Sequence, residues 1–216
     1  DTPLLNSKDA KMFLDSITYN VINKLNCADK SYQVINSVRR TIPDYNRNLI
    51  LPIPKDSSNL TIQKLLEFYQ SSRDFHGDRN CSTNPTIKVV KTQDKLYPFA
   101  KTRYLIIILS RFNKQGNKLL NPVSYKDNIK INNIEYRLIG IACHRGEFSK
   151  FGHYVYYKAE STDQDNVVEE FKGEMLFNDS TVNKLADEKT YNEEFIKENG
   201  YVFLYKRVSP EEDSLS

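Results

Sequence analysis

A histidine, an amide and a carboxylate lie at the ends of two short stretches that have the composition of strands. His153 precedes the aromatic run 154–158, and Asn178 and Asp179 follow the apolar run 175–177. An imidazole can take the proton of a thiol, and a neighbouring amide or carboxylate can fix the tautomer of the ring. Hairpin-like pairing of the two runs would bring His153 and Asn178 together at one sheet edge. The pattern predicts a base with Asn178 as its orienting residue and Asp179 as a second anchor.

Each of these elements also has an ordinary structural interpretation. A lone histidine at the start of a strand is most often structural, and Asn-Asp-Ser at 178–180 is common turn chemistry. The residues around the histidine favour a function. Gly152 permits close approach of the backbone, and Tyr154, Tyr156 and Tyr157 would form a rigid strand that holds the ring.

The three cysteines do not complete this arrangement in an obvious way. Cys27, Cys81 and Cys143 are widely spaced, which is not the pattern of a disulfide framework and indicates a reducing compartment, cytoplasmic or nuclear. Cys143 precedes His153 by only ten residues and falls in a predicted strand. A buried strand thiol is the first interpretation of Cys143, and a rearranged thiol–imidazole pair is the alternative.

Composition excludes several classes of function. The chain has 216 residues, 27% of them charged, and a mean hydropathy of -0.61, so it is globular with an ample core. The net charge of +3, without a run of Lys or Arg, argues against a nucleic-acid partner. The longest apolar run, 105–109, is far too short to span a bilayer, so no membrane partner is expected.

Hydrophobic periodicity predicts helices first and strands later. Apolar residues recur at helical spacing over 8–25. A second helix should follow the cap-forming residues 57–59, with Ile62, Leu65, Leu66 and Tyr69 on one face. Thr190 and Glu193 form a capping-box pair for a short third helix that Gly200 would end.

The strand predictions cover most of the second half of the chain. Run 104–112 is continuously apolar and indicates a strand buried on both faces. Further strands are expected at 134–143, 154–158, 175–177 and 201–206, and a polar loop or exposed hairpin at 71–84. The acidic tail 209–216 is expected to be disordered. The fold class is therefore α+β with a mainly antiparallel sheet.

The order of these segments resembles that of the ubiquitin-specific proteases, which are papain-like cysteine peptidases. The resemblance covers residues from about Ser7 to Arg207. Residues 8–14 resemble a degenerate form of the second conserved sequence motif (box) of that family. The other matching segments are Leu109-Ser110-Arg111-Phe112, residues 134–144 with Gly146, Gly152-His153-Tyr154, Phe177-Asn178-Asp179-Ser180 and residues 201–205.

The resemblance implies a fold and a set of site residues. The fold would be that of the protease without most of its thumb. Residues 1–208 would form a partial domain, with a residual thumb helix at 1–26, the fingers region and a helix at 27–103 and the palm at 104–208. His153 would be the general base, Asn178 the third triad member and Asp179 an auxiliary carboxylate. The loop 145–151 would cover the ubiquitin tail, and 94–101 would be a second blocking loop. Substrate-binding residues would be Arg145, Gly146, Phe148, Gly152 and Tyr154.

Two departures from the family pattern affect chemistry. The first box of the family, which supplies the nucleophilic cysteine, has no counterpart in this chain. The two finger Cys-x-x-Cys pairs read Cys27-x-x-Lys30 and Cys81-x-x-Asn84, so only two of the four ligands for a closed zinc site are present. We therefore expect neither a metal nor another cofactor.

The resemblance implies a deubiquitinase-type thiol peptidase that recognises ubiquitin or a ubiquitinated protein. It would hydrolyse the bond after the C-terminal glycine of ubiquitin, with a nucleophile from outside this chain, so the chain alone would be inactive. The alternative is a catalytically dead pseudoprotease that binds ubiquitin or acts as a scaffold. An unrelated α+β interaction domain is a third interpretation.

Overall fold

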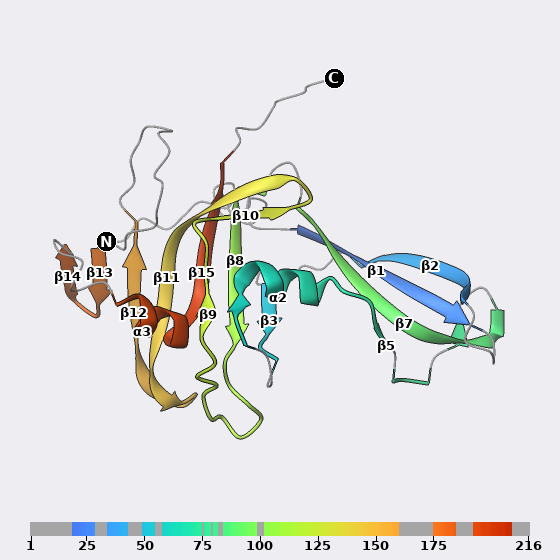
Figure 1. Cartoon of the computed structure of the whole chain (residues 1–216), viewed down its shortest axis with the longest axis horizontal. Coiled ribbons are helices and arrows are strands. Elements are labelled where there is room, and N and C mark those ends of the chain that lie inside the picture. Colours follow the sequence, from blue (N-terminus) through green and yellow to red (C-terminus); the bar gives the residue numbers. More distant parts are fainter. Residues whose placement is uncertain are drawn as a thin grey trace, which may run out of the picture.

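The computed structural model describes residues 19–28, 34–42, 49–54, 58–74, 76–78, 80–81, 84–98, 102–159, 175–184 and 192–208. These residues form a large sheet, a smaller sheet, one short strand pair and two helices (Figure 1). Neither helix of these ranges is long and apolar enough to cross a membrane. The α+β class is confirmed.

The large sheet has eight strands in the order β14-β13-β12-β11-β15-β8-β3, and β10 pairs with β11 beside this path. All pairs are antiparallel except the parallel pair β3–β8. The strands are β3 (Leu49–Pro52), β8 (Tyr104–Ser110), β10 (Asn128–Ile131), β11 (Ile134–Phe148), β12 (Phe151–Lys158), β13 (Met175–Asn178), β14 (Thr181–Lys184) and β15 (Gly200–Arg207).

The predicted strands of the second half of the chain agree with this sheet, apart from the burial of one of them. The apolar run predicted to be buried on both faces forms β8, but only Leu105, Ile107 and Leu109 are buried. Ile106 and Ile108 on the other face are half-buried. Successive side chains of a strand point to opposite faces, so the two faces of β8 differ in how completely they are covered.

Two short helices flank the large sheet, both near their predicted positions. Helix α2 (Ile62–Tyr69) packs against β3 and buries Ile62, Leu65 and Leu66. Its N-cap is Thr61, whose hydroxyl accepts a hydrogen bond from the Lys64 amide at 3.1 Å, rather than a residue of 57–59.

Helix α3 (Glu193–Asn199) packs against β11 and β15 and buries Ile196. It starts at Asn192, whose side chain accepts from the Phe195 amide at 2.9 Å. Gly200 is the C-cap, as predicted. Thr190, the other half of the predicted capping box, lies outside the described residues.

The smaller sheet extends away from the larger one in Figure 1. It contains β1 (Tyr19–Ala28), β2 (Val34–Ile42), β5 (Arg73–Asp74), β6 (Asn80–Cys81) and β7 (Asn84–Pro98). The order is β2-β1-β7-β5, β6 also pairs with β7, and every pair is antiparallel. A separate parallel pair joins β4 (Leu60–Thr61) to β9 (Val123–Ser124).

Two predictions for the first half of the chain are wrong. The helix predicted over 8–25, and with it the thumb helix at 1–26, is a strand from Tyr19 onward, because β1 pairs along most of its length with both β2 and β7. Residues 1–18 lie outside the described ranges. The second blocking loop expected at 94–101 is also wrong over residues 94–98, which belong to β7. The tail 209–216 lies outside the described residues.

One face of the large sheet carries the core. Side chains from β3, β8, β11, β12 and β15 form a single buried cluster with those of α2 and α3. The cluster includes Leu51, Ile107, Leu109, Ile141, Cys143, Val155, Tyr157, Phe203, Tyr205, Leu65 and Ile196.

The guanidinium of Arg111 connects the end of β8 to α3 and β15. Arg111 is fully buried, and it donates hydrogen bonds to the backbone carbonyls of Lys197, Gly200, Leu119 and Asn121, at 2.5 to 3.1 Å. Burial lowers its pKa to about 10. These four contacts fix the segment that follows β8 against the end of α3.

Candidate functional site

His153 and Asn178 meet at one edge of the large sheet. β12 and β13 are antiparallel neighbours, with Tyr156 opposite Phe177. Nε2 of His153 is hydrogen-bonded to Oδ1 of Asn178, so the predicted juxtaposition is present. An amide oxygen can only accept, so Nε2 must carry the hydrogen. In the neutral ring Nδ1 then keeps its lone pair, which is the state that a general base requires.

Asp179 lies on the other side of the imidazole. It is the first of the two residues that connect β13 to β14, where Asn178 pairs with Thr181, and its φ of 51° is a conformation that Asp tolerates better than most residues. One carboxylate oxygen is 3.8 Å from Nδ1 of His153. The Asp179 side chain is 80% exposed and that of His153 37% exposed. Solvent therefore weakens the support that this carboxylate could give to an imidazolium.

The cysteine nearest in sequence to this base is not placed as a nucleophile. Cys143 lies in β11 opposite Val155, and it is completely buried. Burial raises the pKa of its thiol to about 12, so the thiol stays protonated at neutral pH. These observations oppose the rearranged thiol–imidazole pair that the sequence left open.

The other two cysteines belong to the smaller sheet. Cys27 is near the end of β1, whose arrowhead points away from the large sheet in Figure 1, and Cys81 is in β6. The backbone of Cys27 is paired with Val89, and that of Cys81 with Asn84. In the part of the chain that is described, His153 therefore has an orienting amide but no partner thiol.

The hairpin formed by β11 and β12 requires glycine next to His153. Gly152 has a φ of 154°, and a Cβ there would overlap the imidazole of His144 and lie 2.5 Å from the Arg145 carbonyl oxygen. Gly146 has a φ of 140°, and its Cβ would lie 2.7 Å from the Phe151 carbonyl oxygen. Both glycines are thus needed for the hairpin backbone to close.

The buried side chain of His144 packs against this hairpin. It is 1% exposed, and its ring packs edge-on against Phe112 and Tyr154, with centroid distances of 5.2 and 4.8 Å. Burial lowers its pKa. Its backbone carbonyl accepts a hydrogen bond from Nζ of Lys118. The sequence analysis gave His144 no role, although its position two residues before Gly146 could have signalled one.

The structure separates the five residues predicted to bind substrate. Arg145 is the cross-strand partner of His153, and its guanidinium lies 5.1 Å from the centroid of the Phe195 ring, a cation–π contact. Tyr154 is 51% exposed and points to the opposite face from His153. Phe148 is 50% exposed at the hairpin end. Gly146 and Gly152 shape the backbone, so only Arg145 is directly opposite the histidine.

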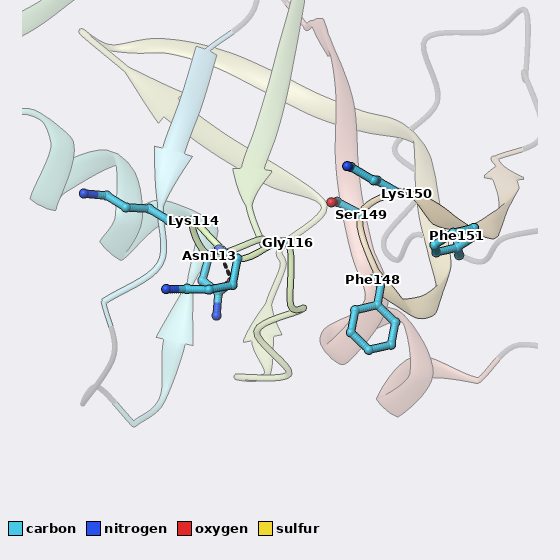
Figure 2. Close-up of a pocket in the computed structure, with 8 residues that line it drawn as sticks. Asn113, Lys114, Gly116, Phe148, Ser149, Lys150 and Phe151 are labelled. Atoms are coloured by element: carbon cyan, nitrogen blue, oxygen red, sulfur yellow. Dashed lines mark hydrogen bonds between the residues drawn. The ribbon is translucent and has the colours of Figure 1, made fainter.

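A pocket adjoins this hairpin, and we name it the loop pocket (Figure 2). It has a volume of about 510 Å³. Residues of two loops line it, namely Asn113, Lys114, Gln115, Gly116, Phe148, Ser149, Lys150 and Phe151.

Hydrogen bonds join the two loops of the pocket. The Ser149 amide donates to the Gly116 carbonyl at 2.9 Å, and the Lys118 amide donates to the Glu147 carbonyl at 2.8 Å. The sequence analysis missed the first loop. Its turn signal, Asn-Lys-Gln-Gly-Asn at 113–117, is clear, but its contact with 147–149 is a tertiary feature.

Two of the four positions at which the resemblance would place zinc ligands carry other residues. Lys30 and Asn84 stand where the second member of each ligand pair would be. Within the described ranges, no group of three or more His, Cys, Asp or Glu residues is arranged to hold a metal.

Comparison with known proteins identifies relatives. A family model described as ubiquitin carboxyl-terminal hydrolase matches residues 8–205. No curated protein matches the chain.

Several solved structures have the same fold. The SAGA Ubp8/Sgf11/Sus1/Sgf73 DUB module bound to ubiquitin aldehyde contains a chain that is similar with a TM-score of 0.66 and 20% identity, over 89% of this chain and 42% of that chain. A chain of a yeast SAGA DUB module with an Sgf73 mutant is similar with a TM-score of 0.63 and 20% identity, over 94% of this chain and 46% of that chain. A chain of a SAGA DUB module bound to monoubiquitin is similar with a TM-score of 0.64 and 19% identity, over 89% of this chain and 41% of that chain. The chain thus spans less than half the length of these relatives.

Proposed function

Because the chain belongs to the ubiquitin carboxyl-terminal hydrolase family, we propose that it is the fingers and palm of a deubiquitinase-type thiol peptidase. It recognises ubiquitin or a ubiquitinated protein, and the bond after the C-terminal glycine of ubiquitin is cleaved. His153 acts as the general base, Asn178 orients it, and Asp179 is an auxiliary carboxylate. The nucleophilic thiol comes from a segment outside this chain. The compartment is cytoplasmic or nuclear.

One observation carries the proposal: the hydrogen bond between Nε2 of His153 and Oδ1 of Asn178. A histidine with only a packing role would not need an amide that selects its tautomer. With Nε2 protonated, Nδ1 can take a thiol proton and later return it to the leaving amine. Similar structures that contain ubiquitin aldehyde or monoubiquitin support ubiquitin as the partner.

The test uses the longest natural product that contains this chain. Hydrolysis of a fluorogenic ubiquitin C-terminal amide is compared for the wild type, His153→Ala, Asn178→Ala and, as a matched control, the exposed His76→Ala. We expect His153→Ala to lower kcat/KM by about 10²–10⁴-fold, Asn178→Ala to lower it by less, and His76→Ala to leave it unchanged. Full activity of His153→Ala would contradict the proposal.

A second candidate function is a pseudoprotease that binds ubiquitin without cleaving it. The observation in its favour is that Cys143, the thiol closest in sequence to His153, is buried with a pKa of about 12. Ubiquitin binding by calorimetry, together with the absence of hydrolysis in every natural product of the gene, would favour this candidate. Hydrolysis that depends on His153 would exclude it.

A further inference from the structure

The two sheets meet at Leu96, which belongs to both of them. Its backbone lies in β7 of the smaller sheet, opposite Val21 of β1. Its side chain is 1% exposed and packs in the buried cluster of the large sheet. In Figure 1, β7 extends from the far end of the smaller sheet to the part of the large sheet that carries β10. Contacts at Leu96 therefore affect how the smaller sheet is oriented.

Side chains from outside the smaller sheet satisfy both backbone polar groups of Leu96. Its amide donates a hydrogen bond to Oε1 of Gln70 at 3.1 Å, and its carbonyl accepts one from Nδ2 of Asn132. A strand residue directs its amide and its carbonyl to the same side. Leu96 thus directs both groups away from β1, and the two side chains stand where a neighbouring strand would otherwise pair. We name Gln70, Leu96 and Asn132 the Leu96 clamp.

No strand in the described ranges pairs with Leu96 on that side. β5 pairs with β7 only at Thr92 and Lys91, which precede Leu96. Gln93 adds a third hydrogen bond between β7 and α2, because its Nε2 donates to the Gln70 carbonyl at 2.9 Å. Buried backbone groups without a partner cost free energy. The clamp therefore favours one position of β7 relative to the large sheet.

The two side chains of the clamp come from preformed parts of the fold. Gln70 is the C-cap of α2, its amide donates to the Leu66 carbonyl at 3.0 Å, and α2 packs against β3. Asn132 and Asn133 form the turn between β10 and β11, with φ angles of 49° and 67°. Positive φ at both positions is the type I′ pattern of two-residue hairpins, which asparagine tolerates. The clamp thus joins two fixed elements to β7.

We propose that Gln70 and Asn132 are positioning residues that hold the smaller sheet in one orientation for the binding of ubiquitin. A folded partner that contacts both sheets binds more tightly when their orientation is fixed in advance, because ordering them on binding costs free energy. Neither residue needs to touch the partner or His153. The inference rests on the proposed function for the identity of the partner, but not for the orientation of the sheet.

The experiment removes the clamp and leaves the backbone conformation unchanged. Gln70→Met keeps the length of the side chain and loses the acceptor, whereas Asn132→Gly keeps the positive φ and loses the donor. Gln63→Met on α2 and Asn133→Gly in the same turn are the matched controls. The Gln63 side chain donates to Glu67 at the surface of the helix, and Asn133 is exposed.

Amide residual dipolar couplings, measured by NMR on the weakly aligned chain, report the orientation of each sheet. In the wild type, one alignment tensor should fit both sheets. In the protein with Gln70→Met and Asn132→Gly, the large sheet should keep its fit, which shows that it is folded, and the couplings of the smaller sheet should shrink. Each single variant should show a smaller effect, and both controls should behave as the wild type. One shared tensor for both sheets in all three clamp variants would overturn the proposal.

Calorimetry with ubiquitin measures the consequence for binding. The double variant should bind ubiquitin about fivefold more weakly or worse, and both controls should keep the wild-type Kd. Gln70→Glu should bind as the wild type does, because a carboxylate oxygen can accept from the Leu96 amide. Unchanged affinity in a double variant whose smaller sheet has lost its fixed orientation would overturn the positioning role.

Failure of the proposed function would give a different result. If the wild type binds no ubiquitin, and the clamp variants still loosen the smaller sheet, the proposed function is contradicted and the orienting role of Gln70 and Asn132 is supported. Ubiquitin binding by the wild type, with unchanged couplings in the clamp variants, would overturn the inference and leave the proposed function in place.

Discussion

Gly152 lies directly against the imidazole of His144, so that no side chain larger than hydrogen fits between them. A Cβ at Gly152 would overlap Nε2 of His144. His144 is almost completely buried, and its carbonyl is held by Lys118. Packing against the His144 ring thus fixes Gly152, the residue before His153. The position of His153 depends on this contact, which lies on the opposite face of the sheet.

Gly152→Ala should destabilise the protein. The new methyl group would clash with His144, and alanine would be strained at a φ of 154°. We expect a loss of about 1–3 kcal/mol in the free energy of unfolding, measured by urea denaturation. Lys150→Ala, an exposed change in the same hairpin, should have little effect. A Gly152→Ala protein as stable as the wild type would show that the hairpin can move away from His144.

Arg111→Met should be the most destabilising of the changes considered. It removes all four guanidinium hydrogen bonds to backbone carbonyls, in a region that is buried or partly buried. We expect the free energy of unfolding, measured by urea denaturation, to fall by about 3–5 kcal/mol. The stability of Arg111→Lys should lie between that of the wild type and that of Arg111→Met, because a lysine ammonium cannot reproduce the planar arrangement of guanidinium donors. Lys130→Met, an exposed loss of charge, is the control. Wild-type stability of Arg111→Met would contradict the importance of this connection.

Cys143 should resist alkylation in the folded protein. Its thiol is completely buried, and its pKa is about 12, so the reactive thiolate is scarce at pH 8. Iodoacetamide at pH 8 should modify Cys143 only after unfolding, as read from peptide masses. The same measurement with a ubiquitin carrying a C-terminal electrophile should give no adduct at Cys143. Modification of native Cys143 would revive the rearranged thiol–imidazole pair.

The same thiol should contribute to a loss of stability at alkaline pH. In the unfolded chain a thiol titrates near pH 9, whereas folded Cys143 keeps its proton until about pH 12. The unfolded state therefore loses the proton first, and stability falls as pH rises from 9 to 12, by at most about 1.4 kcal/mol per pH unit. Cys143→Ala should show a smaller fall in a pH series of urea denaturations. Tyr136, whose pKa is also raised to about 12, contributes equally to both proteins. Parallel curves for the two proteins would refute this assignment.

His144 should contribute to a loss of stability at acid pH. Burial and the nearby Lys118 lower its pKa below the ordinary value of 6.5, so the unfolded chain binds the proton first. Stability should then fall as pH decreases through about 6.5. Between pH 7.5 and 5, His144→Gln, which cannot titrate at this position, should lose less stability than the wild type. His76→Gln, at an exposed position, should behave as the wild type. An equal acid loss in all three proteins would assign the effect to other groups.

Much of the large sheet could be predicted from the sequence, because its signals are local. A continuous apolar run defines β8, aromatic and β-branched residues define β12 and β15, and short apolar faces define α2 and α3. The contact between His153 and Asn178 could be predicted for the same reason, since the two residues border strands that are close in sequence and pair directly. Their catalytic roles remain a proposal.

Only the tertiary structure decided the remaining features, because they depend on partners far away in the chain. Residues 19–25 have apolar spacing that also fits a helix, and they form a strand because β7, about seventy residues later, supplies the hydrogen bonds. Cys143 is buried because it packs in the same apolar cluster as Ile196 of α3, a helix about fifty residues later. The walls of the loop pocket meet because Gly116 and Lys118 are hydrogen-bonded to Ser149 and Glu147. Local propensity is weaker than such long-range pairing, so a sequence read one segment at a time does not contain these contacts.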